Sequence, residues 1–213
     1  TNFKVHTFTG PGTFCVSCAG NTGGSNTVSY MVVAGGGGGG GNDAVAGGGA
    51  GGFREGLGLN DSYTGSPLRA PTGVTVPVQA YPIIVGGGGA GHPATPSPDT
   101  RGTSGSNSVF STITSTGGGG GGGGPSVAPT TSATGRPGGS GGGGAVNNND
   151  GGGKPGGTGN TPSVTPPQGN PGGTGASDAT SYMVGGGGGG ATAAGESMTN
   201  PVPTGDTAGV GGA

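Results

Sequence analysis

The stretch VFSTITSTGGGGGGGG, Val109–Gly124, decides the fold of this chain because it joins a β-like segment to eight unbroken glycines, Gly117–Gly124. The same pairing of a short apolar segment with a glycine run recurs at residues 32–41, 83–89 and 182–190. Glycine carries no side chain, so these runs can perform no chemistry. They are either flexible spacers or backbone packed against backbone, and the choice between the two determines the fold.

The composition is far from that of an average globular protein. Of 213 residues, 64 are Gly and 18 are Pro, while only 7% are charged, against a usual share of about 25%. So much Gly and Pro is typical of disorder, but the shortage of charge is not. The chain has no Gly-X-Y period, which excludes collagen. Flexible linkers mix Gly with Ser and Lys, whereas here pure glycine runs alternate with turn-forming segments, and this regularity favours an ordered structure.

The ordered form of polyglycine is a left-handed helix with about three residues per turn and about 3.1 Å rise per residue. It has no internal hydrogen bonds, so a bundle of such helices can pair each N–H and C=O with a neighbour. Only glycine lets backbones approach that closely. The predicted fold is therefore all-β or irregular with almost no α-helix: a small β-sheet base and a bundle of left-handed polyglycine II helices.

Residues 1–34 are predicted to form the base as a β-hairpin or meander around the Gly10–Pro11–Gly12 turn. Segments 74–85 and 109–116 return to this base, and residues 35–213 form the bundle with its intervening polar loops. The expected strands are residues 3–8, 13–17, 28–34, 74–79, 81–85 and 109–114. The expected core of the base is Phe3, Phe8, Phe14, Tyr30, Val33, Val76, Ile84, Phe110 and Ile113.

Charge and hydropathy exclude several classes of partner. Six basic and eight acidic residues give a net charge of −2 and no basic patch, so nucleic acid is not an expected partner. No stretch approaches the roughly 18 apolar residues of a membrane-spanning helix, and no signal peptide is visible. Because the chain begins at Thr1 without Met, we expect a processed product or a fragment of a longer protein.

The motifs that could carry catalysis are weak. Gly-x-Gly-x-x-Gly occurs many times without a βαβ unit, and residues 151–155 lack the Ser or Thr that a P-loop needs after its Lys. Cys15-x-x-Cys18 could indicate zinc or redox chemistry, but only His6 and His92 remain as partners, so two structural thiols or a local bridge are favoured. Arg54 and Glu55 are expected to form a surface pair. We predict no enzymatic activity, no cofactor and no metal.

Part of the sequence resembles a known family. The residues concerned are Phe8–Thr9–Gly10, Gly12–Thr13–Phe14, Val28–Ala34 leading into Gly35–Gly41, Gly47–Arg54, and Tyr81–Val85 leading into Gly86–Gly91. This pattern resembles the glycine-rich domain of bacteriophage tail-fibre tips, and is similar to the receptor-binding adhesins of T-even-like phages, whose tips are polyglycine II sandwiches. The likeness is closest over the first 125 residues, and Cys15 and Cys18 lie outside it.

The resemblance implies a virion protein, extracellular at the fibre tip, whose loops between glycine runs touch a bacterial outer-surface protein or glycan. It also implies an upstream fibre shaft, or the rest of a longer chain, as a partner, with a homotrimer as one arrangement. The sequence names neither the host nor the receptor.

A topological argument selects the loops that would face the receptor. If the four glycine runs 35–41, 86–89, 117–124 and 185–190 all leave one sheet, the loops that follow them should cluster at the far end. These loops are residues 42–46, 92–100, 125–137 and 191–207. By alternation, residues 158–170 join them and residues 145–150 lie near the base. The candidate receptor-binding residues are Asn42, Asp43, His92, Asp99, Arg101, Arg136, Asn160, Gln168, Asn170, Glu196 and Asn200.

Two other functions remain open. Polyglycine II bundles can also present flat Thr/Ala faces to ice, although an ice-binding protein would need short regular Gly-X-X repeats and the loops here are long and irregular. A structural, glycine-rich extracellular matrix protein would suit a disordered chain. Thermal hysteresis would identify the first alternative, and proteolysis throughout the glycine runs would identify the second.

Overall fold

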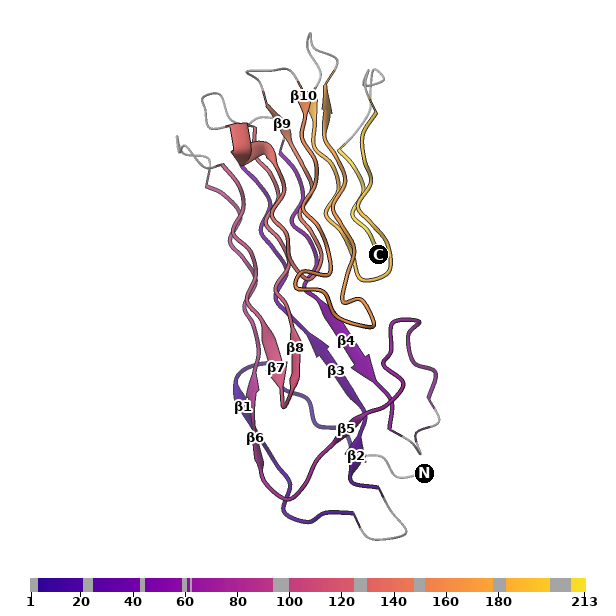
Figure 1. The fold of residues 1–213 in the computed structure, drawn as a ribbon. Coiled ribbons are helices and arrows are strands. Elements are labelled where there is room, and N and C mark those ends of the chain that lie inside the picture. The colour runs from indigo at the N-terminus through magenta and orange to yellow at the C-terminus, as the bar shows by residue number, and fades with distance from the viewer. Residues whose placement is uncertain are drawn as a thin grey trace.

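The computed structural model describes residues 4–20, 25–42, 45–58, 61, 63–93, 100–124, 130–147, 152–177, 183–199 and 208–213. The molecule is elongated, with short strands at one end, which we call the base, and a bundle of extended segments leading to the opposite, distal end (Figure 1). The fold is all-β with small antiparallel sheets, as predicted. Within the described residues the helical structure is one 3-10 turn, η1 (Thr130–Ala133), and none of it is long and apolar enough to cross a bilayer.

The base contains eight strands. They are β1 (Gly12–Cys15), β2 (Thr27–Val28), β3 (Tyr30–Val33), β4 (Phe53–Gly56), β5 (Val74–Thr75), β6 (Ala80–Ile84), β7 (Ser108–Phe110) and β8 (Ile113–Ser115). β1, β6, β7 and β8 form a four-stranded antiparallel sheet in that order, while β2 pairs with β5 and β3 pairs with β4. At the distal end β9 (Val146–Asn147) pairs with β10 (Gly152–Gly153), and β11 (Ala176–Ser177) pairs with β12 (Met183–Val184).

The expected hairpin or meander within residues 1–34 is wrong. None of the three strands described in this segment pairs with another of the three, and the described residues Lys4–Phe8 form no strand. β3 pairs with β4 instead, because the chain leaves the base after β3, runs out and back through glycine segments, and returns beside β3. The strands of the base are therefore joined through the bundle and not through local turns.

Aromatic rings form the centre of the four-stranded sheet. Phe14 on β1, Tyr81 on β6 and Phe110 on β7 lie with ring centroids 6.0–6.3 Å apart, a spacing typical of favourable aromatic pairs. His6 adds an edge-on contact to Phe14 at 5.1 Å. Tyr81, which we did not expect in the core, is only 3% exposed.

The predicted burial of two core residues is wrong. Val33 is 48% exposed and Ile84 is 52% exposed, whereas Val32 is buried. Successive side chains of a strand point to opposite faces, so Tyr30 and Val33 could not both face inward. Of the other expected core residues, Tyr30 and Val76 are buried; Phe8, Phe14, Phe110 and Ile113 are half-buried; and Phe3 lies outside the described residues.

The turn between β7 and β8 consists of Ser111 and Thr112, and Ser111 has φ of 54°. A positive φ at the first central residue only is the pattern of a type II′ turn, where glycine is preferred. A residue with a side chain that adopts this positive-φ conformation costs roughly 1–2 kcal/mol, and glycine at the same position avoids part of that cost.

We expect Ser111→Gly to raise the free energy of unfolding by about 0.5–1 kcal/mol, as measured by denaturant unfolding. The matched variant Thr112→Gly, at the neighbouring position without a positive φ, should lower it. If both substitutions destabilise the protein equally, the backbone strain assigned to Ser111 is wrong.

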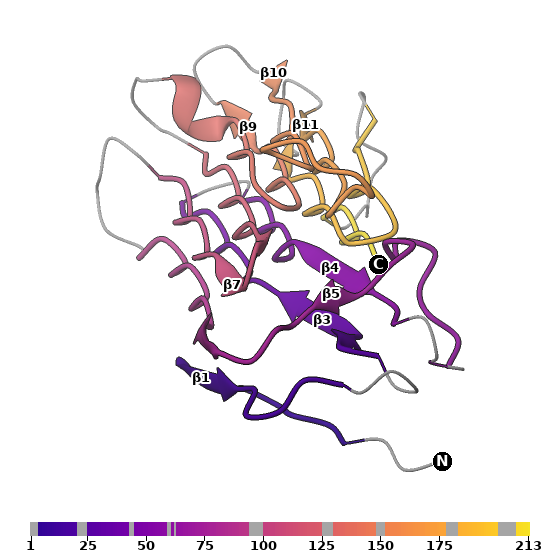
Figure 2. The same cartoon turned by 60° about the horizontal axis from the view of Figure 1, so that its bottom comes forward.

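The bundle has the three-residue repeat of polyglycine II. Every third N–H of Gly35–Gly41 donates to the same neighbouring segment, residues 100–106, through the pairs Gly35–Ser106, Gly38–Thr103 and Gly41–Thr100 at 2.8–3.1 Å. Intervening groups point to other neighbours, as Gly37 donates to Gly49 and Gly40 to Ala46. A helix with about three residues per turn produces this pattern because equivalent groups recur once per turn. Figure 2 shows these segments side by side as an array of narrow coils.

The run Gly117–Gly124 lies in the interior of the bundle, and all eight of its residues are buried. Among the described residues, the backbone of this run hydrogen-bonds to segments 34–42, 46–52, 100–107, 134–139 and 140–146, and the Gly123 N–H donates to Ser132 of η1. The N–H of the adjoining Thr116 donates to the side chain of Gln168. The backbone groups that polyglycine II cannot satisfy internally are thus paired by its neighbours. This arrangement agrees with the predicted packing of backbone against backbone.

Glycine is required here for space and not for an unusual conformation. None of the glycines in Gly35–Gly41, Gly86–Gly89, Gly117–Gly123 and Gly185–Gly190 has φ between +20° and +160°. A Cβ atom placed on any residue of Gly117–Gly123 would instead come within 3.0 Å of a backbone atom of a neighbouring helix. Peripheral helices need glycine less often, since in residues 102–108 only every third position, Gly102, Gly105 and Ser108, faces inward.

The chain crosses the bundle repeatedly. Ascending segments, which lead away from the base, are residues 34–42, 86–92, 117–124, 140–146, 169–177 and 195–199. Descending segments, which lead back, are residues 46–52, 100–107, 134–139, 152–159, 183–190 and 208–213. The run Gly185–Gly190 therefore points toward the base, and the expectation that it points away is wrong. Its preceding strand, β12, belongs to a separate strand pair at the distal end.

Candidate functional site

The distal end collects the ends of crossings that are far apart in the sequence. The ascending segments 34–42, 86–92 and 117–124 all finish there, as do the strand pairs β9–β10 and β11–β12 (Figure 1). Parallel backbone pairing aligns the first and third of these segments, and an isolated bridge joins Asn42 to Gly124. The loops that follow are thus held at one end of a hydrogen-bonded array.

Asn42 ends the first ascending segment and is exposed, with φ of 63°. Asn is among the few residues that tolerate this left-handed conformation, so it can turn the chain out of the helix. The neighbouring candidate Asp43 lies outside the described residues. The first candidate loop therefore starts at the distal end, where the sequence predicted it.

His92 and Thr100 frame the second distal loop. The N–H of His92 donates to Gly39 at 3.0 Å, and the carbonyl of Thr100 accepts from Gly41 at 2.8 Å. His92 Nδ1 and Thr100 Oγ1 are buried and have no hydrogen-bond partner within the described part of the chain. Candidate Asp99, between them, lies outside that part.

The two candidate arginines are attached to the bundle. Arg101 follows Thr100 and is half-buried. Arg136 is also half-buried, and its Nε donates to the carbonyl oxygen of Gly102 at 3.2 Å while its backbone N–H donates to Gly120 at 2.8 Å. The guanidinium of Arg136 therefore links two helices, a structural role that the sequence did not indicate.

The prediction that residues 158–170 join the distal loops is wrong. Gln168 is fully buried; its Oε1 accepts from the Thr116 N–H at 2.8 Å and its backbone oxygen from Phe53 at 2.8 Å, both next to the base. Asn160 has φ of 49° and its Oδ1 accepts from the N–H of Val164 and of Gln168. These two candidates stabilise a turn beside the base and do not face away from it.

Asn170 also lies in the basal part of the bundle. Its Nδ2 donates to Ala191 at 2.9 Å and its backbone N–H donates to Gly190 at 3.0 Å, which joins two basal turns. Residues 191–194 form the second of these turns, so the start of the predicted distal loop 191–207 is misplaced. Glu196 lies on the following ascending segment, where Oε2 accepts from the Val210 N–H at 2.8 Å. Asn200 lies outside the described residues.

Residues 145–150 were predicted near the base, yet the described part of this segment, Ala145–Asn147, lies at the distal end with β9. The missed signal is a chain reversal around Ser140. Gly139 pairs with Gly117 in an antiparallel arrangement, whereas Gly119 and Gly122 pair with Ser140 and Gly143 in a parallel one. The sequence Pro137–Gly138–Gly139–Ser140 is a turn signal, but it lies inside a glycine-rich stretch that reads as one run.

Within the described residues no group of three or more His, Cys, Asp or Glu side chains could hold a metal ion. Cys15 and Cys18 are free and exposed, so the expected local bridge is not formed. Arg54 and Glu55 form no ion pair in the described part of the chain, because Glu55 faces the other side of β4 and its Oε2 accepts from the Ser66 N–H at 2.8 Å.

Comparison with known proteins places the chain in a family. No curated protein and no solved structure matches it. A family model described as a glycine-rich domain matches residues 9–213, nearly the whole chain and including both base and bundle. The chain therefore belongs to the glycine-rich domain family.

Proposed function

We propose that this protein is a receptor-binding adhesin at the tip of a bacteriophage tail fibre, without enzymatic activity. The distal loops recognise a bacterial outer-surface protein or glycan, and the base attaches to the upstream fibre shaft or to the rest of a longer chain. The observation that carries this proposal is the collection of loop ends at the distal end, opposite the base (Figure 1).

The bundle suits the role of a rigid support. Binding loops cost less entropy when their ends are already fixed. The ends of the 42–46 and 92–100 loops are held by backbone hydrogen bonds of 2.8–3.1 Å between glycine helices. Recognition loops carried by a rigid scaffold are also the common arrangement in binding proteins.

The chemistry of the distal end favours hydrogen bonding over electrostatic capture. The whole chain has only six basic and eight acidic residues, and the side chain of Arg136, whose backbone pairs with Gly120 within the bundle, already donates to Gly102. Asn42 is exposed at this end. Neutral polar groups of this kind fit a protein loop or a glycan better than a polyanion.

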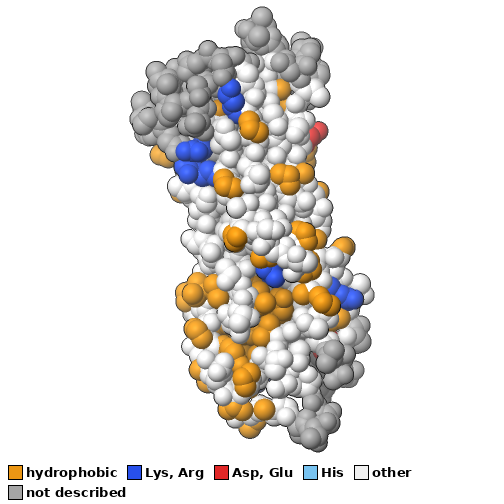
Figure 3. Space-filling model, viewed as in Figure 1, with side chains coloured by type: hydrophobic (Ala, Val, Ile, Leu, Met, Phe, Trp, Pro, Cys, Tyr) orange, Lys and Arg blue, Asp and Glu red, His pale blue; other side chains and the backbone are white. Residues whose placement is uncertain are grey.

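The base has a different surface, on which hydrophobic side chains gather (Figure 3). The exposed large hydrophobic residues described in the base are Val5, Met31, Val33, Tyr63, Val78 and Ile84. Extensive exposed apolar surface is typical of a contact with another protein. This supports attachment of the base to the fibre, which leaves the distal end free.

A cell-binding experiment tests the proposal. We expect the fluorescently labelled chain to bind a subset of strains in a bacterial panel, and replacement of residues 94–99 by an equal length of Gly and Ser to weaken binding at least about tenfold, equivalent to about 1.4 kcal/mol. The control Lys4→Ser/Val5→Ser changes two exposed residues of the base and should bind within about twofold of the unmodified chain.

Equal thermal midpoints of the three proteins would show that the fold is preserved. Loss of binding in the base variant together with full binding by the loop variant would refute the assignment of recognition to the distal end. Thermal hysteresis without cell binding would favour an ice-binding protein instead.

A further inference from the structure

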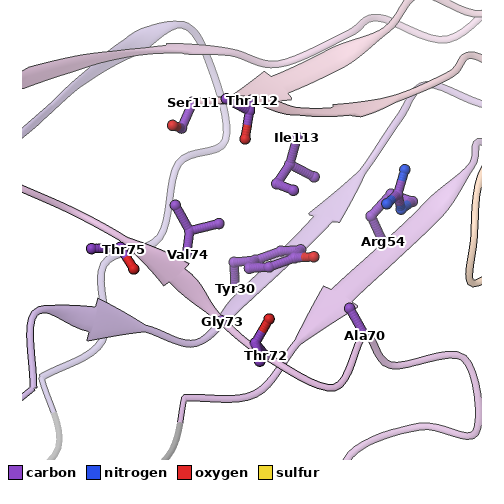
Figure 4. Close-up of a pocket in the computed structure, with 10 residues that line it drawn as sticks. All are labelled: Tyr30, Arg54, Ala70, Thr72, Gly73, Val74, Thr75, Ser111, Thr112 and Ile113. Atoms are coloured by element: carbon purple, nitrogen blue, oxygen red, sulfur yellow. The ribbon is translucent and has the colours of Figure 1, made fainter.

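A pocket of about 400 Å³ opens in the base, far from the distal loops. It forms where β3, β4, the segment leading into β5, and the β7–β8 turn meet (Figure 4). Its lining residues are Tyr30, Arg54, Ala70, Thr72, Gly73, Val74, Thr75, Ser111, Thr112 and Ile113. Its volume is within the range of about 300–1,000 Å³ that is usual for small-molecule sites.

Arg54 supplies the only charge among the lining residues. Its side chain is half-buried, and within the described part of the chain it forms no hydrogen bond or ion pair. The adjacent acid, Glu55, is 8% exposed and its carboxylate accepts from the Ser66 N–H. A partly buried charge without a counter-ion is unfavourable, and an anionic group in the pocket would offset that cost.

Tyr30 forms the floor of the pocket. It is 8% exposed, yet its hydroxyl has no hydrogen-bond partner within the described residues. Burial raises the pKa of Tyr30, and the nearby Arg54 charge opposes the rise, so the phenol is protonated at neutral pH. The ring of Tyr30 is buried, but its hydroxyl is not among the buried side-chain atoms that lack a partner in the described residues, so this hydroxyl is accessible from solvent and available to a ligand.

The remaining walls provide both hydroxyl and apolar groups. Thr72, Thr75, Ser111 and Thr112 line the pocket, and their hydroxyls form no hydrogen bond in the described part of the chain; Thr75 and Thr112 are exposed to solvent. Val74 and Ile113 face the Tyr30 ring (Figure 4). Ser111 holds its position despite a positive φ of 54°. One cation, several hydroxyls and two apolar side chains match the carboxylate, hydroxyls and C–H face of an acidic sugar.

We propose that this pocket binds a monosaccharide carrying a carboxylate, with the carboxylate on Arg54 and the sugar hydroxyls on Tyr30 and the threonine and serine hydroxyls. The site does not involve the distal loops, so the experiments on this pocket test it independently of receptor recognition at the distal end. It would give the base a ligand of its own.

Titration calorimetry of the full chain with sodium glucuronate tests this site. We expect saturable binding, weakened about 10- to 100-fold in Arg54→Gln, because hydrogen bonds to charged groups are the strong ones. Arg69→Gln removes an exposed arginine that does not line the pocket and should change affinity less than about twofold. Tyr30→Phe, which removes only the hydroxyl, should weaken binding about 3- to 10-fold.

Ligands that carry only the sugar ring or only the negative charge show how much each part contributes to binding. Glucose should bind at least about tenfold more weakly than glucuronate because it cannot pair with Arg54. Acetate and inorganic phosphate should also bind more weakly, since they lack the ring and its hydroxyls. An unaltered thermal midpoint identifies a variant that retains the fold. If Arg54→Gln does not fold, Tyr30→Phe still tests the site.

Three results would overturn the proposal. The first is the absence of saturable glucuronate binding. The second is equal affinity in the chain and in a folded Arg54→Gln or Tyr30→Phe variant. The third is equal affinity for acetate or phosphate and glucuronate, which would show an unspecific anion site.

Discussion

Gly120→Ala is expected to lower the free energy of unfolding by at least about 3 kcal/mol. The added Cβ would overlap the carbonyl oxygen of Gly102 on a neighbouring helix, and backbone atoms cannot move aside as a flexible side chain can. Separating the helices would also weaken the bond from Gly102 N–H to Gly121 (2.9 Å) and that from Arg136 N–H to Gly120 (2.8 Å). Against a total stability of about 5–15 kcal/mol this is a large loss, measurable by urea unfolding and as a lower thermal midpoint.

The matched control is Gly87→Ala on a peripheral helix. A Cβ at Gly87 meets no atom within 4 Å, and its φ is not in the left-handed region. The substitution should therefore raise stability by about 0.4–1 kcal/mol, because alanine has less freedom in the unfolded chain. Opposite signs at the two positions would distinguish close packing from a general preference for glycine. Equal effects would show that Gly117–Gly124 is not packed as described.

Gln168→Leu should be the most damaging substitution of a single side chain, lowering the free energy of unfolding by about 2–4 kcal/mol. Gln168 is fully buried; its Oε1 accepts from the Thr116 N–H and its Nε2 donates to Pro162 at 3.0 Å. Leucine fills a comparable space but leaves both backbone groups without a partner. Denaturant unfolding, followed by circular dichroism, measures the loss.

Gln168→Glu supplies the control, because its effect should depend on pH. The protonated acid can accept from Thr116 and donate to Pro162, whereas the ionised form cannot donate. Burial raises the native pKa above the unfolded value of about 4.3, so the variant should be close to the original chain below that pH. Its relative stability should fall as pH rises from about 4.3 through the raised native pKa. A constant difference at all pH values would contradict the proposed hydrogen bonds.

The sequence predicted the fold class because the glycine runs leave few physical choices. Eight glycines without charge or apolar side chains can be ordered only through their backbone groups, and all eight residues of Gly117–Gly124 are buried. The strands β1, β6 and β7 could also be found from alternating apolar residues. The pairing of β3 with β4 could not be predicted, because these strands are joined through a glycine excursion that has no side-chain pattern to specify its partners.

The direction of each crossing was predictable only where a polar loop separated two runs. The reversal between Gly139 and Ser140 occurs without such a loop, and missing it inverted the placement of residues 145–150 and 158–170. That single error moved Gln168 and Asn170 to the wrong end. The pocket around Arg54 could not be predicted either, because Tyr30 and Arg54 lie on two strands, β3 and β4, whose pairing the sequence does not reveal.

On a peripheral helix of the bundle, every third residue lies in one row that faces solvent, and this row has a practical consequence. Gly87, Ala90 and Pro93 are exposed at successive turns of one ascending segment, and a Cβ at Gly87 meets open space. Positions three apart on such a helix are separated by about 9.3 Å, a spacing fixed by the helix rise. Cysteines or other reactive side chains grafted onto this row would present chemical groups at regular intervals along a stiff rod, which makes the chain a molecular ruler for displaying ligands.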